Sequence, residues 1–319
     1  MNNILGPIQE AVPKLKHVMI CQSAIEKFVA NIQLSQLDGT EYNCDTILYG
    51  ATEEEHITFP FVYDAMNFSY WGSPKWTIDI DSQSFDGSAA MIRAIKRGQE
   101  EINLLKADVL ANLTKKDLAC VLRGNVRIPL FNERLRLLNS LGRNIRDNFR
   151  SSFKSFVDSS DWDAEKLTMA LVEIIPDVFD DTSTFHGHSI HFYKRAQLVS
   201  THLYDLNKLN KIDKRMSNMN KLTAFADYKV PQLMRNMGIL VYDDMLASKV
   251  DMQIELESGS EEEVEIRIAT VWANELATKE LKKRIPSATA AQVDGAIWFG
   301  GQNSKVNIKP YHRTRTIWY

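Results

Sequence analysis

The most constraining feature of the sequence is a long helical periodicity that begins after Pro129. The apolar residues of this stretch follow one another at spacings of three and four: Phe131, Leu135, Leu138, Leu141, Ile145 and Phe149. On an α-helix, side chains at these spacings share one face. The stretch therefore predicts an amphipathic helix packed on a hydrophobic core.

The basic residues of the same region fall mainly on the opposite face of that helix. They are Arg127, Arg134, Arg136, Arg143 and Arg146. A nucleic-acid-binding surface is one interpretation. A solvated face balanced by Glu133 and Asp147 is the other, and we favour it because acidic partners stand at helical spacing.

Further segments repeat the helical pattern. Helices are predicted from Ile25 to Ile32, from Leu104 through Thr114 to Leu118, from Ala164 to Ile175, from Ile190 to Leu209, after the capping box Ser260-Glu-Glu-Glu263, and from Ser287 to a stop at Gly300-Gly301. Strand signals are fewer. The aromatic run from Phe59 passes through Gly72-Ser-Pro74 into alternating Trp76, Ile78 and Ile80, which predicts a hairpin, and residues 310–319 are expected to be held as a strand. The fold class is thus mainly α with a small antiparallel β element.

Composition supports a globular protein of ordinary kind. The 319 residues are 44% hydrophobic and 25% charged, enough to bury roughly three quarters of the unfolded surface. No Pro/Gly/Ser-rich linker divides the chain, so we expect one compact domain over residues 1–319, with residues 1–58 as a packed N-terminal layer.

Charge and cysteine content exclude several classes. A net charge of −3 and a pI of about 6.2 argue against a protein that binds nucleic acid directly through its phosphate backbone. Cys21, Cys44 and Cys120 form no C-x-x-C pair, which indicates neither a disulfide framework nor a thiolate zinc site. No targeting segment and no run of 18 apolar residues occurs, so a cytoplasmic protein without membrane contact is expected.

The segment from Leu222 to Leu240 predicts a turn that feeds a short helix. Pro231 fits the first helical position and Gly238 the residue just past the end. Val230, which precedes proline, is expected to be extended, leaving Asp227 near unpaired backbone N–H groups that favour a charged carboxylate. Asp227 is then either a helix cap or an anion facing a developing positive charge.

Two further polar features admit alternatives. Lys194 lies about 200° around the predicted helix from the apolar Phe192, so it faces either solvent or a second interior such as a ligand pocket. His186-Gly-His-Ser-Ile-His191 has metal-like spacing, but no carboxylate or cysteine beside it completes a ligand set. We therefore expect a turn with partly exposed histidines and no metal.

The aromatic run also carries polar groups suited to a planar heterocycle. Asp64, Asn67, Phe68, Tyr70 and Trp71 combine a carboxylate, an amide and stacking rings. The alternative is that these rings are simply core residues.

Six separated blocks, in the same order, resemble the queuosine salvage protein family. They are Asp64-Ala-Met-Asn-Phe-Ser-Tyr-Trp71, Ile128-Pro-Leu-Phe-Asn-Glu-Arg134, Phe192-Tyr-Lys-Arg-Ala-Gln197, Phe225-Ala-Asp-Tyr-Lys-Val-Pro-Gln232, Glu263-Val-Glu-Ile-Arg267 and Pro310-Tyr-His-Arg-Thr-Arg315. The resemblance covers about residues 55–319 and is weak over residues 1–50. It implies a mostly helical fold similar to helix-hairpin-helix DNA glycosylases. It also implies a hydrolase that cleaves queuosine 5′-phosphate, a free nucleotide, and releases the 7-deazaguanine base queuine for reuse in tRNA.

The resemblance also implies site residues, and no cofactor. It makes Asp227 the catalytic carboxylate, places Lys194 and Phe225 in the site, and directs Asp64, Asn67 and Phe68 towards the base. From the residues themselves we assign the 5′-phosphate to the basic C-terminal segment, with Tyr311, His312, Arg313 and Arg315 as donors.

The chemistry of N-glycoside cleavage agrees with these residue types. The sugar becomes oxocarbenium-like, and a carboxylate beneath it stabilises that charge and activates water. A 7-deazaguanine lacks N7, so hydrogen bonds on its pyrimidine edge, for instance from its N–H donors to the Asp64 carboxylate, must stabilise the leaving base. Queuine's cationic aminomethyl group favours acidic neighbours. A DNA or RNA base-repair glycosylase and a non-enzymatic queuine or nucleotide carrier remain as alternatives; the former would need a basic footprint.

Overall fold

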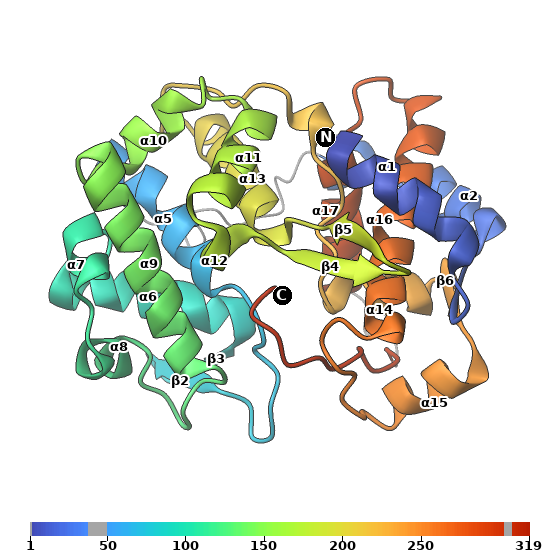
Figure 1. The fold of residues 1–319 in the computed structure, drawn as a ribbon, viewed down its shortest axis with the longest axis horizontal. Helices are drawn as coiled ribbons and strands as arrows, with labels where there is room; N and C mark the ends of the chain where they lie inside the picture. Colours follow the sequence, from blue (N-terminus) through green and yellow to red (C-terminus); the bar gives the residue numbers. More distant parts are fainter. Residues whose placement is uncertain (1, 38–49, 303–307) are drawn as a thin grey trace.

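The computed structural model describes residues 2–37, 50–302 and 308–319. Helices dominate, and the strands pair only as short antiparallel ribbons (Figure 1). The α-helices are α1 (Asn2–Ala11), α2 (Gln22–Asn31), α3 (Leu34–Leu37), α5 (Glu53–Met66), α6 (Gly87–Ile102), α7 (Ala107–Ala111), α8 (Lys115–Val121), α9 (Phe131–Phe149), α10 (Phe153–Ser159), α11 (Ala164–Ile174), α12 (Pro176–Phe179), α13 (Lys194–Lys208), α14 (Lys229–Asn236), α15 (Asp244–Asp251), α16 (Glu261–Lys282) and α17 (Ala290–Gln302). The 3₁₀ turns are η1 (Val12–Lys14) and η2 (Met219–Lys221).

The strands form three pairs within these residues. The pairs are β1 (Val18–Ile20) with β6 (Leu240–Tyr242), β2 (Thr77–Ile80) with β3 (Gln83–Asp86), and β4 (Thr182–Phe185) with β5 (His188–His191). The predicted fold class, mainly α with small antiparallel elements, is confirmed. Among the described helices none has the length and apolar character needed to cross a membrane.

The long amphipathic helix is confirmed as α9, but one of its arginines does not lie on a solvated face. Arg136 pairs with Glu133 and Arg146 with Asp147 near the surface, as expected. Arg134, in contrast, is fully buried and donates to the backbone carbonyls of Met66 and Phe68. Its guanidinium satisfies carbonyl groups left free where α5 ends, a role that a helical wheel does not reveal.

One predicted helix boundary was wrong because β-pairing replaces helix. Ile190 and His191 belong to β5, where His191 pairs with Thr182, so α13 begins only at Lys194. The predicted turn at His186 is confirmed, since His186 and Gly187 connect β4 to β5 with positive φ angles.

The predicted hairpin was placed one element too early. Most of the aromatic run, up to Met66, lies in α5, and Trp76 precedes β2. The hairpin joins β2 to β3 through Asp81 and Ser82, which both have positive φ. A two-residue turn of this kind matches the twist of antiparallel strands, which Gly72-Ser-Pro74 does not provide.

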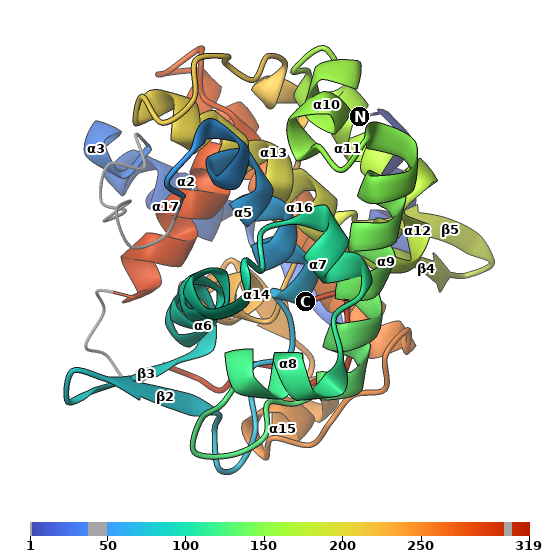
Figure 2. The same cartoon turned by 90° about the vertical axis from the view of Figure 1, so that its left-hand side faces the viewer.

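The C-terminal predictions also need correction. Helix α17 continues through Gly300 and Gly301 to Gln302, and Gly300 has no positive φ, so this pair does not end the helix. Residues 310–319 form no strand beyond one isolated bridge between Glu255 and Arg313. Individual hydrogen bonds hold them instead, such as Ser69 N–H to Tyr319 O at 2.9 Å, and the C-terminus lies near the centre of both views (Figures 1 and 2).

Helix α16 joins the two sides of the molecule. Figure 1 shows α5–α10 gathered on one side and α1, α2 and α14–α17 on the other, with α13 and the β4–β5 hairpin between them. The buried apolar side chains form two clusters, and α16 contributes to both: Val264, Ile268 and Val271 to the first, Ile266, Ala269 and Ala273 to the second. The Ser260 cap expected for this helix is confirmed, since its side chain accepts the Glu263 N–H.

Candidate active site

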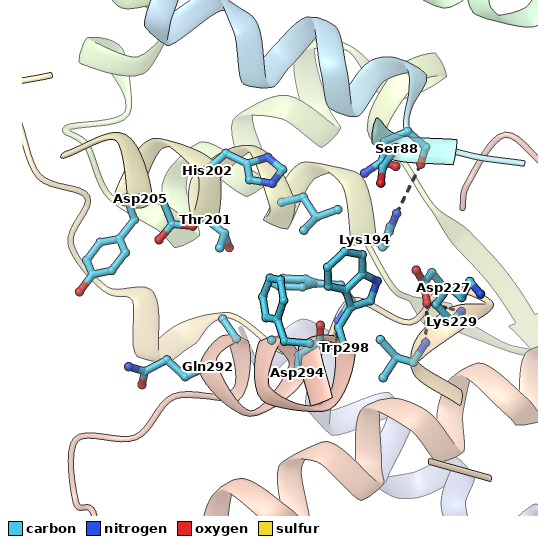
Figure 3. Close-up of a pocket in the computed structure, with 18 of the residues that line it drawn as sticks. Ser88, Lys194, Thr201, His202, Asp205, Asp227, Lys229, Gln292, Asp294 and Trp298 are labelled. Carbon is cyan, nitrogen blue, oxygen red and sulfur yellow. Dashed lines mark hydrogen bonds between the residues drawn. The ribbon is translucent and has the colours of Figure 1, made fainter. Parts of the chain in front are cut away.

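A cavity of about 1140 Å³ lies where α13, the turn before α14, and α17 face one another. Figure 3 shows Lys194 of α13 opposite Asp294 and Trp298 of α17, with Asp227 and Lys229 to one side and Thr201, His202 and Asp205 to the other. The cavity is therefore elongated. Asp227 and Lys229 lie at one end, His202 and Asp205 lie at the other, and the aromatic ring of Trp298 lies between them.

Asp227 is held at this cavity by the start of α14. Its Oδ1 accepts the N–H groups of Lys229 and Val230 at 2.7 and 2.8 Å. The expectation that Val230 is extended was wrong, because α14 begins at Lys229 and Pro231 is its third residue. Proline is tolerated there, since the N–H groups of a first turn have no partner within the helix. Asp227 thus caps the helix and also lines the cavity.

Lys194 faces the interior and not solvent. It opens α13 after Tyr193, whose positive φ of 49° turns the chain out of the β5 hairpin. Its side chain is buried, and Nζ donates to the Asn67 carbonyl at 3.3 Å. Burial lowers the pKa of Lys194, while the charge of Asp227 acts in the opposite direction. An ammonium so desolvated depends on nearby anions for its charge.

Asp294 is a second buried carboxylate in the wall, and the sequence analysis missed it. The side chain is only 4% exposed, and Oδ1 accepts the Phe225 N–H at 3.0 Å. Burial raises the pKa of Asp294 from 3.8 to about 7, and the charge of Asp227 adds to this effect while Lys194 opposes it. The available signal was a single carboxylate inside the apolar stretch from Ala290 to Trp298.

Asp64 lies one layer behind the cavity wall. It is fully buried, and its Oδ2 meets His202 Nδ1 at 2.8 Å. His202, by contrast, lines the cavity. Burial disfavours charge on His202, but the charge and hydrogen bond of Asp64 outweigh it and raise the pKa. Asp64 therefore orients His202 and favours its charged form.

Phe68 is also outside the lining. Its ring lies between two buried guanidinium groups, with Arg134 at 4.1 Å and Arg195 at 5.2 Å from the ring centroid. Arg195 also donates to the carbonyls of Asp64 and Ala65. Together these contacts fix the end of α5, which delivers Asn67 to the cavity.

Aromatic side chains form much of the wall between the charged ends. Phe225, Trp298 and Phe299 face the cavity, as do Tyr70 and Trp71. The Tyr70 hydroxyl and the Trp71 Nε1 are buried without a hydrogen-bond partner among the described residues. Flat rings of this kind suit stacking against a planar ligand.

The four C-terminal residues assigned to phosphate are separated in the structure. Tyr311 lines the cavity, with its ring 4.9 Å from that of Tyr228 and the Lys229 ammonium 4.9 Å above it. His312 is buried against Tyr319, and burial lowers its pKa to about 3.

The two arginines contact Trp71 instead of the cavity. Arg315 lies 3.4 Å from the Trp71 ring centroid and donates to its carbonyl, while Arg313 lies 5.6 Å from the same ring and bonds to Gln253. Both therefore support an aromatic side chain of the cavity wall.

Comparison with known proteins identifies the family of this chain. A family model described as queuosine salvage protein matches residues 47–319. The chain belongs to the queuosine salvage protein family. Three relatives are named queuosine 5′-phosphate N-glycosylase/hydrolase. The protein of Sphaerobacter thermophilus is 34% identical over 99% of this chain and 97% of its own, and that of Bos taurus is 31% identical over 100% of both. The protein of Mus musculus is 29% identical over 84% of this chain and 83% of its own.

The site residues expected from the sequence, whether from the family resemblance or from the residues themselves, divide into two groups. Asn67, Lys194, Phe225, Asp227 and Tyr311 line one cavity. Asp64, Phe68, His312, Arg313 and Arg315 do not, and they contact residues that do or pack behind them. The cavity is also lined by residues that were not expected from the sequence: His202, Asp205, Tyr228, Lys229, Asp294 and Trp298.

The histidine cluster lies away from the cavity. His186 bonds to Glu261 at 3.1 Å, and His191 bonds to Thr182 and Tyr193 within the β4–β5 hairpin region. In the described part of the chain, no three His, Cys, Asp or Glu side chains are grouped so as to hold a metal ion.

Proposed function

We propose that this protein hydrolyses the N-glycosidic bond of queuosine 5′-phosphate and releases queuine for salvage into tRNA. The observation that carries the proposal is Asp227, a carboxylate that lines the cavity while two backbone N–H groups hold its Oδ1. Such a group stabilises an oxocarbenium-like sugar and accepts a proton from the attacking water. The activity carried in the relatives' names supports the same reaction.

The base fits the part of the cavity walled by aromatic side chains. Phe225 and Trp298 offer rings for stacking, and Asn67 brings an amide beside Lys194. Asp205 lies eleven residues after Lys194 on α13, about 16 Å further along the helix axis. A carboxylate at that end favours the cationic aminomethyl substituent of the queuine base.

The sugar phosphate fits the opposite end, next to Asp227. Lys229 follows Asp227 by two residues, and its ammonium lies over the Tyr311 ring within the same wall. We therefore assign the main phosphate contact to Lys229 with Tyr311, and assign Arg313 and Arg315 to the support of Trp71. His312 serves the packing of the C-terminus, because it is buried with a low pKa.

Asp64 and Phe68 enter the proposal as positioning residues. Asp64 holds His202 towards the ligand, and Phe68 fixes the loop that presents Asn67. Neither one needs to touch the base to influence its recognition.

The architecture proposed is one cooperative domain related to helix-hairpin-helix glycosylases. Supporting a single domain, α16 supplies apolar side chains to both hydrophobic clusters. Supporting the glycosylase relationship, the candidate catalytic carboxylate lies in a turn that leads directly into a short helix. The protein would act in the cytoplasm on a free nucleotide, without direct nucleic-acid contact and without a cofactor.

The test is incubation of the purified protein with queuosine 5′-phosphate, followed by mass spectrometry of free queuine and ribose 5-phosphate. Stoichiometric release of both supports the hydrolase. Binding without release would favour a queuine or nucleotide carrier. Release from a queuosine-containing oligonucleotide but not from the free nucleotide would favour a base-repair glycosylase, which must extrude its base from a polymer.

A further inference from the structure

The cavity contains a second carboxylate whose environment differs from that of Asp227. Asp294 lies on α17, one helical turn before Trp298, so both side chains share the face that lines the cavity. Figure 3 shows the two projecting from α17 towards Lys194. The Oδ1 of Asp294 is engaged by the Phe225 N–H, whereas Oδ2 accepts no hydrogen bond from the described residues.

Burial favours the neutral form of Asp294, although the hydrogen bond from the Phe225 N–H favours the charged form. Asp227, from the turn before α14, repels a negative charge on it, and Lys194 of α13 attracts one. The same cavity is lined by further charged or titratable side chains, namely His202 and Asp205 of α13 and Lys229 of α14. Helix α16 presents the neutral Asn274, whose amide donates to the Ala290 carbonyl. Burial outweighs these charges, and the pKa of about 7 leaves Asp294 largely protonated in mildly acidic solution.

We propose that Asp294 is the proton donor to the departing base, a role that rests on the proposed hydrolysis. As the bond from C1′ to N9 breaks, its electron pair moves onto the base, and the Asp294 carboxyl proton is transferred to the base. Water adds to C1′ and gives its proton to Asp227. Asp294 regains a proton from solvent and Asp227 releases one, so the net reaction consumes a single water molecule.

The chemistry of the base explains why such a donor is needed. A guanine can be protonated at N7 before it leaves, but a 7-deazaguanine has carbon at that position. The negative charge of the leaving base is spread over N9, N3 and O6, and a neutral carboxylic acid in an apolar wall can protonate it there. Two carboxylates in one site, one charged and one neutral, divide base and acid roles in the same way in other glycoside-cleaving sites.

The direct test compares leaving groups. Asp294→Asn keeps an oxygen that accepts the Phe225 N–H but has no acidic proton. Its kcat for queuosine 5′-phosphate should fall ~10²–10⁴-fold, the usual contribution of general acid catalysis. With 4-nitrophenyl β-ribofuranoside 5-phosphate, whose phenolate leaves without protonation, its kcat should stay within about tenfold of the unmodified protein. Asp163→Asn, which changes a carboxylate at the start of α11 outside the cavity lining, is the control and should show no such dependence on leaving group.

The pH profile supplies an independent readout. The kcat of the unmodified protein should decline above about pH 7, and Asp294→Asn should lose that decline. Equal losses on both substrates, or an unchanged basic limb in the variant, would overturn the proton-donor role. If the unmodified protein does not cleave the nitrophenyl substrate, the pH profile alone decides. If it releases no queuine at all, the proposed function itself fails, which is a distinct outcome.

Discussion

Replacing Asp227 with asparagine separates its capping role from its proposed catalytic role. The amide side chain introduced by Asp227→Asn would retain an oxygen in the position of Oδ1, where the Lys229 and Val230 N–H groups donate. Asparagine caps helices about as well as aspartate does. The substitution therefore removes the charge and the basic oxygen while leaving both backbone hydrogen bonds in place.

The expected effects on stability and rate differ by orders of magnitude. Loss of a negative charge at the start of α14 should cost about 0.3–1 kcal/mol of unfolding free energy, which lowers Tm by less than about 4 °C. Loss of a preorganised electrostatic group costs ~10²–10³-fold in kcat, and loss of base function adds another ~10²-fold. Lys194 would also lose a charge that favours its ammonium form.

The assay measures kcat for queuine release, Tm and queuine binding for Asp227→Asn. Asp163→Asn is the matched control, because Asp163 accepts the N–H groups of Glu165 and Lys166 at the start of α11 and does not line the cavity. Both variants should melt within a few degrees of the unmodified protein, and only Asp227→Asn should lose turnover. A near-native kcat in Asp227→Asn would refute the catalytic assignment and leave a helix cap.

Four other outcomes are expected. Lys229→Ala should raise KM for the nucleotide far more than for the nucleoside, and Arg313→Ala should raise both equally, because only Lys229 lines the cavity; the reverse pattern would return the phosphate to the C-terminal segment. Asp294→Asn should raise Tm at pH 8.5 but not near pH 4. A carboxyl whose pKa rises from 3.8 to about 7 on folding binds fewer protons in the unfolded state, so the stability of the unmodified protein falls as pH rises through this window. The gain in unfolding free energy at pH 8.5 is at most about 4 kcal/mol, and equal Tm values of the two proteins at pH 8.5 would contradict the raised pKa. Asp181 forms a buried ion pair with Arg267, and Asp181→Asn should lower the unfolding free energy by about 3–5 kcal/mol in denaturant titrations because it leaves the Arg267 guanidinium without its charged partner. Glu101→Gln, which breaks the exposed pair with Arg123, should cost less than about 1 kcal/mol. EDTA should leave queuine release unchanged, and loss of activity restored by zinc would overturn the assignment of water activation to Asp227.

Periodicity predicted the helices well but not the buried polar side chains on them. The apolar face of α9 follows directly from spacings of three and four, as does the cap at Ser260. Arg134 belongs to the same helix and is nevertheless buried, because carbonyls at the end of α5 require donors. A requirement set by a segment almost 70 residues earlier has no local signature.

The candidate site shows the same division. The local pattern left two alternatives each for Asp227 and Lys194, and the family resemblance placed both in the site; the structure shows that both line the cavity. Asp294 and Trp298 were not identified. Asp294 stands out as the one carboxylate in the apolar stretch from Ala290 to Trp298, but nothing local shows that this face of α17 lines a cavity. Asp64 was expected at the base on chemical grounds, yet its carboxylate is taken by His202.

The helix-cap and catalytic interpretations of Asp227 support each other in this fold. Both short hydrogen bonds, at 2.7 and 2.8 Å, go to the same oxygen, Oδ1. Oδ2 then remains available to the cavity, and the two bonds restrict rotation of the carboxylate about its side-chain torsions. A group held in this way needs little reorganisation as positive charge develops on the sugar, which is the source of most electrostatic catalysis. A glutamate at position 227 would extend the carboxylate by one methylene and lose this geometry, so Asp227→Glu should be nearly as inactive as Asp227→Asn although it keeps the charge.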